Sequence, residues 1–248
     1  MIARPIKTHK ITSEDKDIFV VLDTYLPKLE ENSVVAISSK IVAICEGRVV
    51  SLEKATKDEL VEQEAELYLP SSENKYGFSI AVKGNMFVAS AGVDESNGNG
   101  YYVLWPKDPQ ASANSIREHL VKKFNLKNLG VVLTDSKTTP LRWGVTGIAV
   151  SHSGFAALED YIGVPDVFGR PMHVTKTNVM DSLAASAVFV MGEGSEQTPI
   201  AVITQVPQVK FQDRNPTQEE LDMLKISIDE DLYAPILKKV EWKKGKKT

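Results

Sequence analysis

Acidic and hydroxyl side chains follow directly after two apolar, β-rich runs of the sequence. The first run ends at Asp94, and the second, Gly130 to Thr134, delivers Asp135 and Ser136 at its carboxyl end. Ligands in α/β folds tend to lie at that end of the strands. Mg²⁺ and Mn²⁺ favour carboxylate and hydroxyl oxygens, which they usually share with phosphates. These residues are therefore candidate cation ligands; the alternative is that each aspartate caps a turn.

A third stretch, M-G-E-G-S-E-Q-T-P at 191–199, lies between a small-residue helical pattern and an apolar run. Gly192 and Gly194 would let backbone amides approach a phosphate closely, and Glu193 could reach a metal ion. The alternative is a helix that ends with Gly192 as its C-cap, followed by an ordinary turn. The residues alone leave both interpretations open.

Several familiar catalytic devices are absent from the sequence. It contains no G-x-x-x-x-G-K-[ST] phosphate loop, no H-E-x-x-H motif and no G-x-S-x-G nucleophile elbow. The four histidines, at 9, 119, 152 and 173, do not have the spacing of metal ligands. The stretch 98–100, G-N-G, lacks the third glycine of a dinucleotide fingerprint.

Short β-rich runs alternate with helical patterns along the chain, which predicts an α+β or α/β fold with a mixed sheet. Asp108 is expected to cap a helix with Pro109 in its first turn, Asp181 to cap another, and Thr217 with Glu220 to form a capping box. The expected helices cover 17–29, 53–67, 108–124, 181–191 and a segment after 217. The expected strands cover 34–38, 42–44, 78–82, 86–93, 130–134, 147–150 and 200–206, with a hairpin turn at 83–85.

Composition places the chain among ordinary globular proteins. Its 248 residues are 42% hydrophobic and 25% charged, and the net charge of -4 argues against a nucleic-acid binder. No apolar run approaches the ~18 residues of a membrane-spanning helix, and the first residues lack the apolar core of a secretory signal. The single cysteine, Cys45, excludes an internal disulfide. We therefore expect a cytoplasmic protein, with the lysine-rich tail after Val240 as a frayed, solvated end.

Four motifs in a fixed order resemble the coenzyme F420 gamma-glutamyl ligase family. They are A-G-V-D-E-S-N at 91–97, V-V-L-T-D-S at 131–136, D-Y-I-G-V-P-D-V-F-G-R-P-M-H-V-T at 160–175 and D-S-L-A-A-S-A-V-F-V-M-G-E-G at 181–194. The stretch from Ser39 to Arg48 extends the resemblance toward the N-terminus, so that it covers roughly residues 10–206.

The resemblance implies a fold and an activity. The fold is an α+β, gamma-glutamyl-ligase-like single domain over 1–248, with mixed sheets and packed helices. Residues 217–248 would form a C-terminal helix and basic tail, and the protein would be an intertwined homodimer. The activity is that of a GTP-dependent, metal-requiring ligase, which joins L-glutamate to a carboxylate of the deazaflavin coenzyme F420-0 through an amide bond. Two Mg²⁺ or Mn²⁺ ions would assist the reaction, and the nucleotide could be ATP in place of GTP. Neither a nucleic acid nor a membrane would be a partner.

The resemblance also assigns site residues. The family's metal ligands carry over to Asp94, Asp135, Ser136 and Glu193. Its nucleotide contacts carry over to Ser39, Lys40, Asn97, Met191, Gly192, Gly194, Ser195, Glu196, Gln197 and Thr198. All three stretches selected above on chemical grounds fall within this set. No catalytic residue is assigned beyond the metal site, and the expected reaction passes through an acyl phosphate.

The sequence departs from the family on the acceptor side. The turn at 136–142, S-K-T-T-P-L-R, lacks the glycine and first arginine of the family's Gly-Arg-Pro-like turn, and Ile44 stands where relatives have a lysine. The segment between Arg48 and Phe78 looks shorter than in relatives, and we expect no appended flavin-reductase-like domain. Lys137 and Arg142 would suit a carboxylate-rich acceptor or are plain surface charges.

Three alternatives therefore stay open. The chain could use glutamate or a glutamyl peptide as acceptor and form polyglutamate. It could be a non-catalytic relative that binds nucleotide or metal. It could also be a phosphotransferase or nucleotide hydrolase with the same metal pair, which would release phosphate without any amino acid.

Overall fold

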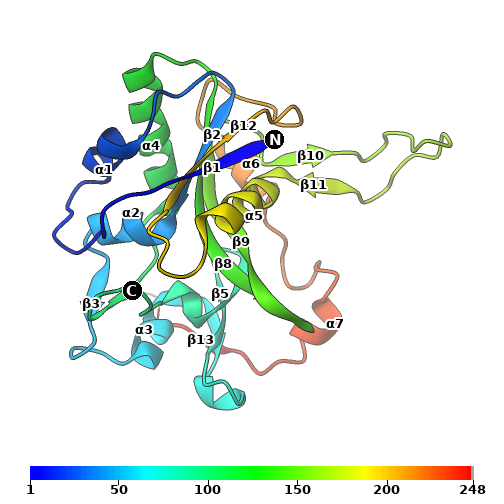
Figure 1. The fold of residues 1–248 in the computed structure, drawn as a ribbon. Helices are drawn as coiled ribbons and strands as arrows, with labels where there is room; N and C mark the ends of the chain where they lie inside the picture. Colours follow the sequence, from blue (N-terminus) through cyan, green and yellow to red (C-terminus); the bar gives the residue numbers. More distant parts are fainter. Residues whose placement is uncertain (247–248) are drawn as a thin grey trace.

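A mixed five-stranded sheet forms the centre of the computed structural model, which describes residues 1–246 (Figure 1). Its strands, in spatial order, are β1 (Ile2–Ile6), β12 (Ile200–Thr204), β2 (Ser33–Ser38), β8 (Leu129–Thr139) and β9 (Arg142–Ser153). β2 and β8 are parallel, and all other neighbours are antiparallel. The prediction of an α+β fold with a mixed sheet is confirmed.

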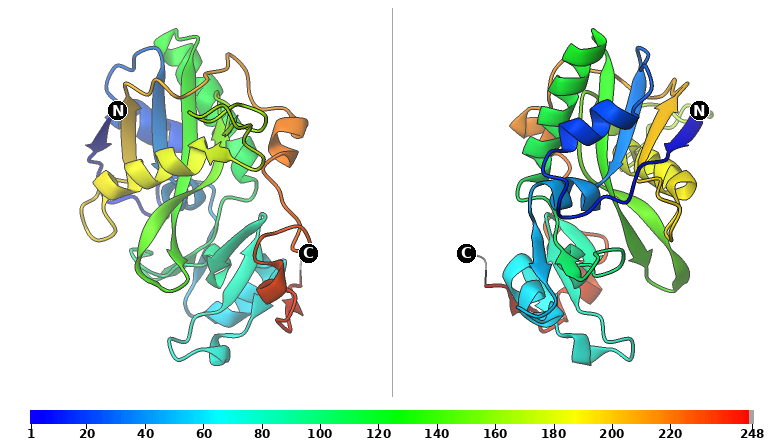
Figure 2. Two further views of the ribbon diagram at one scale, coloured as in Figure 1. Left: turned by 90° about the vertical axis from the view of Figure 1, so that its right-hand side faces the viewer. Right: turned by 60° about the vertical axis from the view of Figure 1, so that its left-hand side comes forward.

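Helices cover both faces of this sheet, because successive residues of each buried strand point to opposite faces (Figure 2). Val35 and Ile37 of β2 pack in one core with α1 (Ile18–Tyr25), α2 (Ser39–Cys45) and α4 (Pro109–Phe124). Val34 and Ala36 pack on the other face against α5 (Val179–Met191). A continuous apolar run such as 34–37 in β2 is the pattern expected of a strand that is buried on both faces.

A second, smaller core lies beside the main sheet. The sheet β13 (Lys243–Lys244), β4 (Leu67–Leu69), β5 (Ile80–Lys83) and β6 (Met86–Ala89) packs with Leu60 and Val61 of α3 (Lys57–Glu64). β3 (Val49–Ser51) pairs with β7 (Tyr101–Val103) between the two cores. The remaining short helices are η1 (Ser71–Glu73), η2 (Ser90–Gly92), α6 (Gln218–Asp222) and α7 (Ala234–Leu237).

Two hairpins project from the body. β10 (Leu158–Asp160) and β11 (Lys176–Asn178) form the base of a long arm that contains residues 161–175 (Figure 1). The β8–β9 hairpin continues well beyond the predicted strands 130–134 and 147–150. Val167 and Phe168 on the arm are 92% and 88% exposed, and Trp143 on the β8–β9 hairpin is 88% exposed.

Helix caps account for several boundaries. Asp108 accepts a hydrogen bond from the N–H of Ala111 at the start of α4, with Pro109 in the first turn, as predicted. The capping box of Thr217 and Glu220 is also confirmed, although the helix it starts spans only five residues. Asp181, in contrast, is not a cap: Asn178 caps α5, and the Asp181 carboxylate accepts the N–H of Ala149 on β9 at 2.9 Å.

Several predicted elements were wrong in type or extent. The helix expected at 17–29 ends at Tyr25, and the strand expected at 86–93 ends at Ala89, where η2 begins. Residues 42–44, expected as a strand, belong to helix α2, whose seven residues are almost all buried. A short, continuously apolar segment has no periodicity that separates a buried helix from a strand. The predicted helix 53–67 shrinks to Lys57–Glu64, because Leu67 begins strand β4.

Residues 243–246 of the basic tail make backbone hydrogen bonds with the body, which corrects the expectation of a frayed end for this part. Lys243 and Lys244 pair with Tyr68 and Leu67 as strand β13, and the backbone N–H of Lys246 donates to Glu62 O at 2.6 Å. A Cβ at Gly245 would lie 1.8 Å from Ala65 O, so this close approach requires a glycine. Lys247 lies outside the described residues. Among residues 1–246, no helix combines the length and apolarity needed to cross a membrane.

Candidate active site

A cleft of about 650 Å³ lies at the carboxyl end of β2, where the parallel pairing of β2 with β8 stops at Thr134. The loop 191–199 enters antiparallel strand β12 at the same edge, and the segments 94–99 and 8–12 complete the walls. The cleft therefore brings together the three stretches selected from the sequence. Of the residues assigned by resemblance, it is lined by Lys40, Asp94, Asn97, Asp135, Ser136 and 191–198.

Three assigned residues do not line this cleft. Ser39 is buried within the first turn of α2, beside Lys40. Lys137 and Arg142 lie farther along the β8–β9 hairpin, and Arg142 is exposed.

Lys40 and Asp94 form an ion pair in the cleft. Lys40 Nζ donates to Asp94 Oδ2 at 2.7 Å and to the backbone oxygen of Ser96 at 2.9 Å. The Ser96 hydroxyl and backbone N–H also donate to the Asp94 carboxylate, at 2.7 and 2.9 Å. Burial raises the pKa of Asp94, but Lys40 and Ser96 together outweigh it, so this pKa lies below its ordinary value. Asp94 is therefore held as a carboxylate.

The negative charge of Asp135 is less well compensated by its neighbours than that of Asp94. A register shift between Leu133 and Thr134 interrupts the β8–β9 ladder just before Asp135, the kind of irregularity that re-aims side chains near active sites. Its Oδ2 accepts the indole N–H of Trp105 at 2.6 Å, and its Oδ1 accepts the N–H of Ser136 at 2.8 Å. Burial raises the pKa of Asp135 above its ordinary value, with a further contribution from Asp94, although both hydrogen bonds oppose this.

Glu193 begins the loop that forms the opposite wall. Partial burial of its carboxylate raises its pKa, and the charges of Asp135 and Asp94 add to this against a hydrogen bond with Ser136. The three acids thus repel one another across the cleft. Asp94 also caps a turn, as the alternative interpretation expected, because its carboxylate accepts the N–H of Ser96. The same carboxylate lines the cleft.

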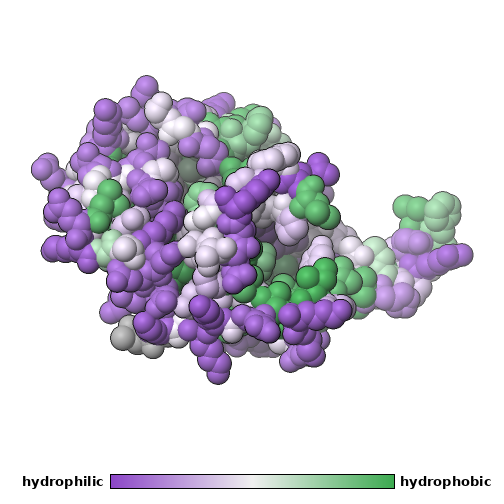
Figure 3. Space-filling model, turned by 90° about the horizontal axis from the view of Figure 1, so that it is seen from below, coloured by the Kyte–Doolittle hydropathy of each residue, from purple (hydrophilic) through white to green (hydrophobic). Residues whose placement is uncertain are grey.

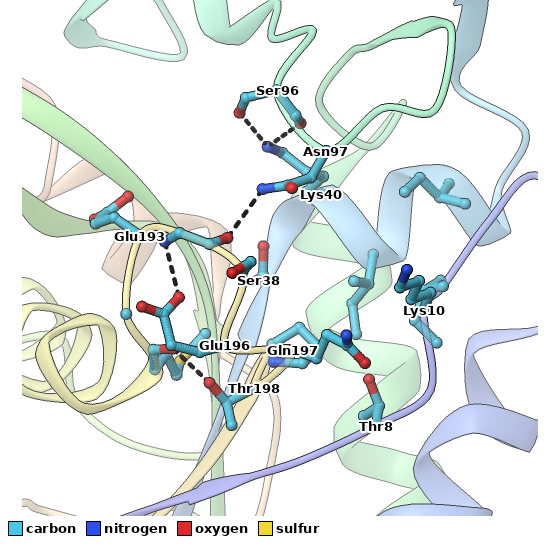
Figure 4. Close-up of a pocket in the computed structure, with 18 of the residues that line it drawn as sticks. Thr8, Lys10, Ser38, Lys40, Ser96, Asn97, Glu193, Glu196, Gln197 and Thr198 are labelled. Atoms are coloured by element: carbon cyan, nitrogen blue, oxygen red, sulfur yellow. Dashed lines mark hydrogen bonds between the residues drawn. The ribbon is translucent and has the colours of Figure 1, made fainter.

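The loop 191–199 is held by its own hydrogen bonds (Figure 4). Gly192 is the C-cap of α5 with φ +79°, so that alternative interpretation is confirmed for this residue. Gly194 N–H donates to Glu196 Oε2 at 2.8 Å, and its carbonyl accepts from the Asn97 amide at 3.1 Å. Gln197 O accepts the Thr8 N–H at 2.9 Å. The loop is both a helix cap and a wall of the cleft.

Sequence reasoning missed several cleft residues. Figure 4 places Lys10 on the side of the cleft opposite Glu193, with Ser38 between them. Among residues 1–246, Lys10 has no ion-pair partner, which leaves its charge available to an anion. Thr8 and Lys10 lie after strand β1, in a segment without hydrophobic periodicity. No local pattern could therefore reveal that this segment lines a cleft. Trp105, the partner of Asp135, gave no signal either.

The donor set suits a hard divalent cation. Asp94, Asp135, Ser136 and Glu193 offer only carboxylate and hydroxyl oxygens, which Mg²⁺ and Mn²⁺ prefer. The raised pKa values of Asp135 and Glu193 reflect negative charge that a cation would neutralise. Within the part of the chain that the structure describes, no three acidic, His or Cys side chains are yet close enough to chelate an ion. The residues fit the group in the chemistry of their donor atoms.

Comparisons with known proteins agree on one family. The family model described as F420-0:Gamma-glutamyl ligase matches residues 2–205. A protein named coenzyme F420:L-glutamate ligase from Methanococcus maripaludis is 35% identical over 237 residues, which covers 94% of this chain and 90% of the relative. Proteins of the same name from Methanopyrus kandleri and Methanocaldococcus jannaschii are 36% and 38% identical, over 71% and 77% of this chain and 75% and 76% of their own lengths.

Proposed function

The chain belongs to the F420-0:gamma-glutamyl ligase family, and on this premise we propose that it joins L-glutamate to a carboxylate of the deazaflavin coenzyme F420-0 through an amide bond. The observation that carries the proposal is the convergence of Asp94, Asp135 and Glu193 with Lys40 and the loop 191–199 in one cleft. Its volume of about 650 Å³ falls in the usual range for small-molecule sites.

A nucleotide, GTP or ATP, would provide the energy for the bond. Lys40 is a cation on a cleft wall, and the glycines of the loop 191–199 allow close approach of backbone to phosphate. The Asn97 amide, which ties the loop to segment 94–99, would keep these groups in register. Lys10, on the far side, would add a second positive charge for the anionic substrates.

Two divalent cations would be held by Asp94, Asp135, Ser136 and Glu193. When bound, they would neutralise charge on the phosphates and polarise the transferred phosphoryl group. The chain's own contribution is to place its carboxylates through fixed hydrogen bonds, Ser96 to Asp94 and Trp105 to Asp135.

The proposed chemistry divides amide formation into two steps. An oxygen of the acceptor carboxylate attacks the γ-phosphorus, the bond to the nucleoside diphosphate breaks, and an acyl phosphate forms. The amine of glutamate then attacks the acyl carbon, loses a proton, and inorganic phosphate leaves. The protein's role is positioning and electrostatic stabilisation, and no covalent enzyme intermediate is needed.

We also propose that the protein is a homodimer. The arm exposes Val167, Phe168 and Val174, and the β8–β9 hairpin exposes Leu141 and Trp143. In Figure 3, seen from below, apolar surface gathers at the tip of the arm and also on the body. Exposed apolar side chains on projecting elements are typical of surfaces that a protein partner covers, and a second copy would bring both hairpins into one interface.

The decisive experiment is mass spectrometry of a reaction with the purified protein, GTP or ATP, Mg²⁺ with Mn²⁺, and L-glutamate, with and without F420-0. We expect a product heavier by one or more glutamyl units only when F420-0 is present. Glutamyl oligomers from glutamate alone would establish the polyglutamate alternative. Phosphate release without glutamate or acceptor would identify a hydrolase, and nucleotide binding without any turnover would identify a non-catalytic relative.

A further inference from the structure

The indole of Trp105 is aimed at one carboxylate of the cleft. Its Nε1 donates to Asp135 Oδ2 at 2.6 Å, while the N–H of Ser136 donates to the other oxygen at 2.8 Å. Trp105 is only 3% exposed, and the indole N–H can only donate. Each oxygen of Asp135 therefore has one fixed donor, and lone pairs remain on both for a further ligand.

A partly buried ionic network holds the indole in place. Lys83 Nζ lies 4.9 Å from the Trp105 ring centroid, within cation–π range, and donates to Glu64 Oε2 at 2.8 Å and Ala91 O at 3.1 Å. Arg48 donates from Nη2 to Glu64 Oε1 at 2.7 Å and from Nε to Trp105 O at 3.1 Å. Glu64 thus joins two cations, one on the ring and one on the backbone of the same tryptophan.

The backbone leaves room for this contact at a single glycine. A Cβ on Gly92 would lie 2.2 Å from Trp105 Nε1, and the residue has φ +72°, a conformation that favours glycine. Gly92 stands two residues before Asp94, in the turn that leads to the other acid. The segment that presents Asp94 therefore also admits the indole that contacts Asp135.

We propose that Trp105 is a positioning residue for the metal-dependent ligase reaction: its indole N–H orients the Asp135 carboxylate, and the Arg48–Glu64–Lys83 network orients the indole. This inference rests on the proposed function, in which Asp135 binds a divalent cation. Outer partners that orient ligating carboxylates typically account for 10–100-fold in metal affinity. Any buried indole N–H needs an acceptor, but here the acceptor is the carboxylate of a proposed metal ligand, and a cation lies over the ring.

The first test is a titration of the metal-free full chain with Mn²⁺. Electron paramagnetic resonance measures the free Mn²⁺ and so gives the binding affinity. Trp105→Phe keeps an aromatic ring and removes the N–H, so we expect Mn²⁺ affinity to fall about tenfold to a hundredfold. Trp242→Phe is the matched control, because its indole also donates, to Leu237 O at 2.9 Å in the C-terminal segment. Wild-type affinity, within twofold, in Trp105→Phe would overturn the proposal.

A second measurement leaves Trp105 unchanged, and its Mg²⁺ titration uses the wild-type chain, so that part does not depend on how a variant folds. The chain has three tryptophans, whose indole ¹H–¹⁵N resonances can be resolved by NMR. We expect the Trp105 resonance to shift on titration with Mg²⁺ and, separately, in Asp135→Asn, while Trp242 stays in place. Saturation with Mg²⁺ that leaves the Trp105 resonance unmoved would also overturn the proposal.

Asp135→Asn separates the two levels of inference. If it binds Mn²⁺ as well as the wild type, the proposed metal site is wrong. If it loses Mn²⁺ binding while Trp105→Phe does not, the metal site stands and only the positioning role fails. Single-turnover kinetics at saturating Mn²⁺ add a further distinction. Loss of affinity alone is rescued by excess metal, whereas misplacement of Asp135 still lowers the single-turnover rate constant.

Discussion

Lys40 Nζ lies 2.7 Å from Asp94 Oδ2, across 54 positions of sequence. The first residue is the proposed phosphate contact, and the second is a proposed metal ligand. In the metal-free protein the ammonium therefore compensates the charge that a divalent cation would otherwise neutralise. A cation at Asp94 would release Lys40 toward the phosphates, so we expect metal and nucleotide to bind cooperatively.

Lys40→Met tests the phosphate contact. Loss of a charge-assisted hydrogen bond costs about 1.5–3 kcal/mol, so we expect the KM for nucleotide to rise by about tenfold to a hundredfold. Without nucleotide, Mn²⁺ should bind at least as tightly as to the wild type, because no ammonium competes at Asp94. Lys54→Met, at an exposed position outside the cleft, is the control. An unchanged nucleotide KM would remove Lys40 from the site.

Asp94→Asn and Asp135→Asn test the acids. Each substitution keeps the shape and removes the charge, so we expect turnover to be abolished while the circular dichroism spectrum is retained. EDTA should also abolish wild-type turnover, and Mg²⁺ or Mn²⁺ should restore it. An active Asp135→Asn enzyme would contradict the site assignment.

His152 governs a pH dependence that is unrelated to catalysis. It is 2% exposed, and its Nδ1 has no hydrogen-bond partner among the described residues. Burial lowers its pKa to about 4 from an ordinary value of 6.5. The unfolded chain therefore binds this proton at a higher pH than the folded chain, and stability falls as pH drops from about 6.5 to about 4, by roughly 3 kcal/mol for this group.

The measurement is urea unfolding at pH 7 and pH 4.5. His152→Gln removes the titrating ring. The free energy of unfolding of this variant should therefore fall less between pH 7 and pH 4.5 than that of the wild type. The carboxylates, which also titrate here, are common to both proteins. His173→Gln, at an exposed position, should behave as the wild type. Equal losses in wild type and His152→Gln would show that His152 is not the source.

Phe168→Asp on the arm tests the proposed dimer. A charge on an apolar surface that a second copy covers would be desolvated without a partner, so we expect dissociation to monomers in light scattering coupled to size-exclusion chromatography. Val20→Asp, which alters an exposed apolar residue of α1, should leave the mass unchanged. A monomeric wild type at micromolar concentration would contradict the dimer itself.

Helices and strands with a clear hydrophobic pattern could be predicted from the sequence. Features that depend on tertiary packing could not. The apolar and helical patterns predicted β2 and α4 close to their observed bounds, and they predicted the turn of the β5–β6 hairpin. Residues 135–139 are polar, so nothing in them indicated that β8 continues to Thr139; the strand persists because it pairs with β9 outside the core. The segment of Asp94 reaches the segment of Asp135 only through the fold.

The residues of the candidate site also divide into those that a local pattern indicates and those that only tertiary packing reveals. Carboxylates at strand ends could be recognised from residue type, whereas Lys10 and Trp105 could not, because their relevance arises from neighbours distant in sequence. The tail was misjudged for a similar reason. Its lysines look solvated in isolation, but the backbone of 243–246 finds partners near Glu62 and Tyr68.

The pairing of β1 with β12 joins two segments that lie about 200 positions apart in the sequence. Ile2 pairs with Thr204, and Lys243 pairs with Tyr68, so both sheets close through contacts between remote segments. Non-local pairing slows folding, because loop-closure entropy is lost before the contacts form. The backbone link from Thr8 to Gln197 forms at the same closure. Ligand-binding competence should therefore appear as a late kinetic phase, after helical structure has already developed.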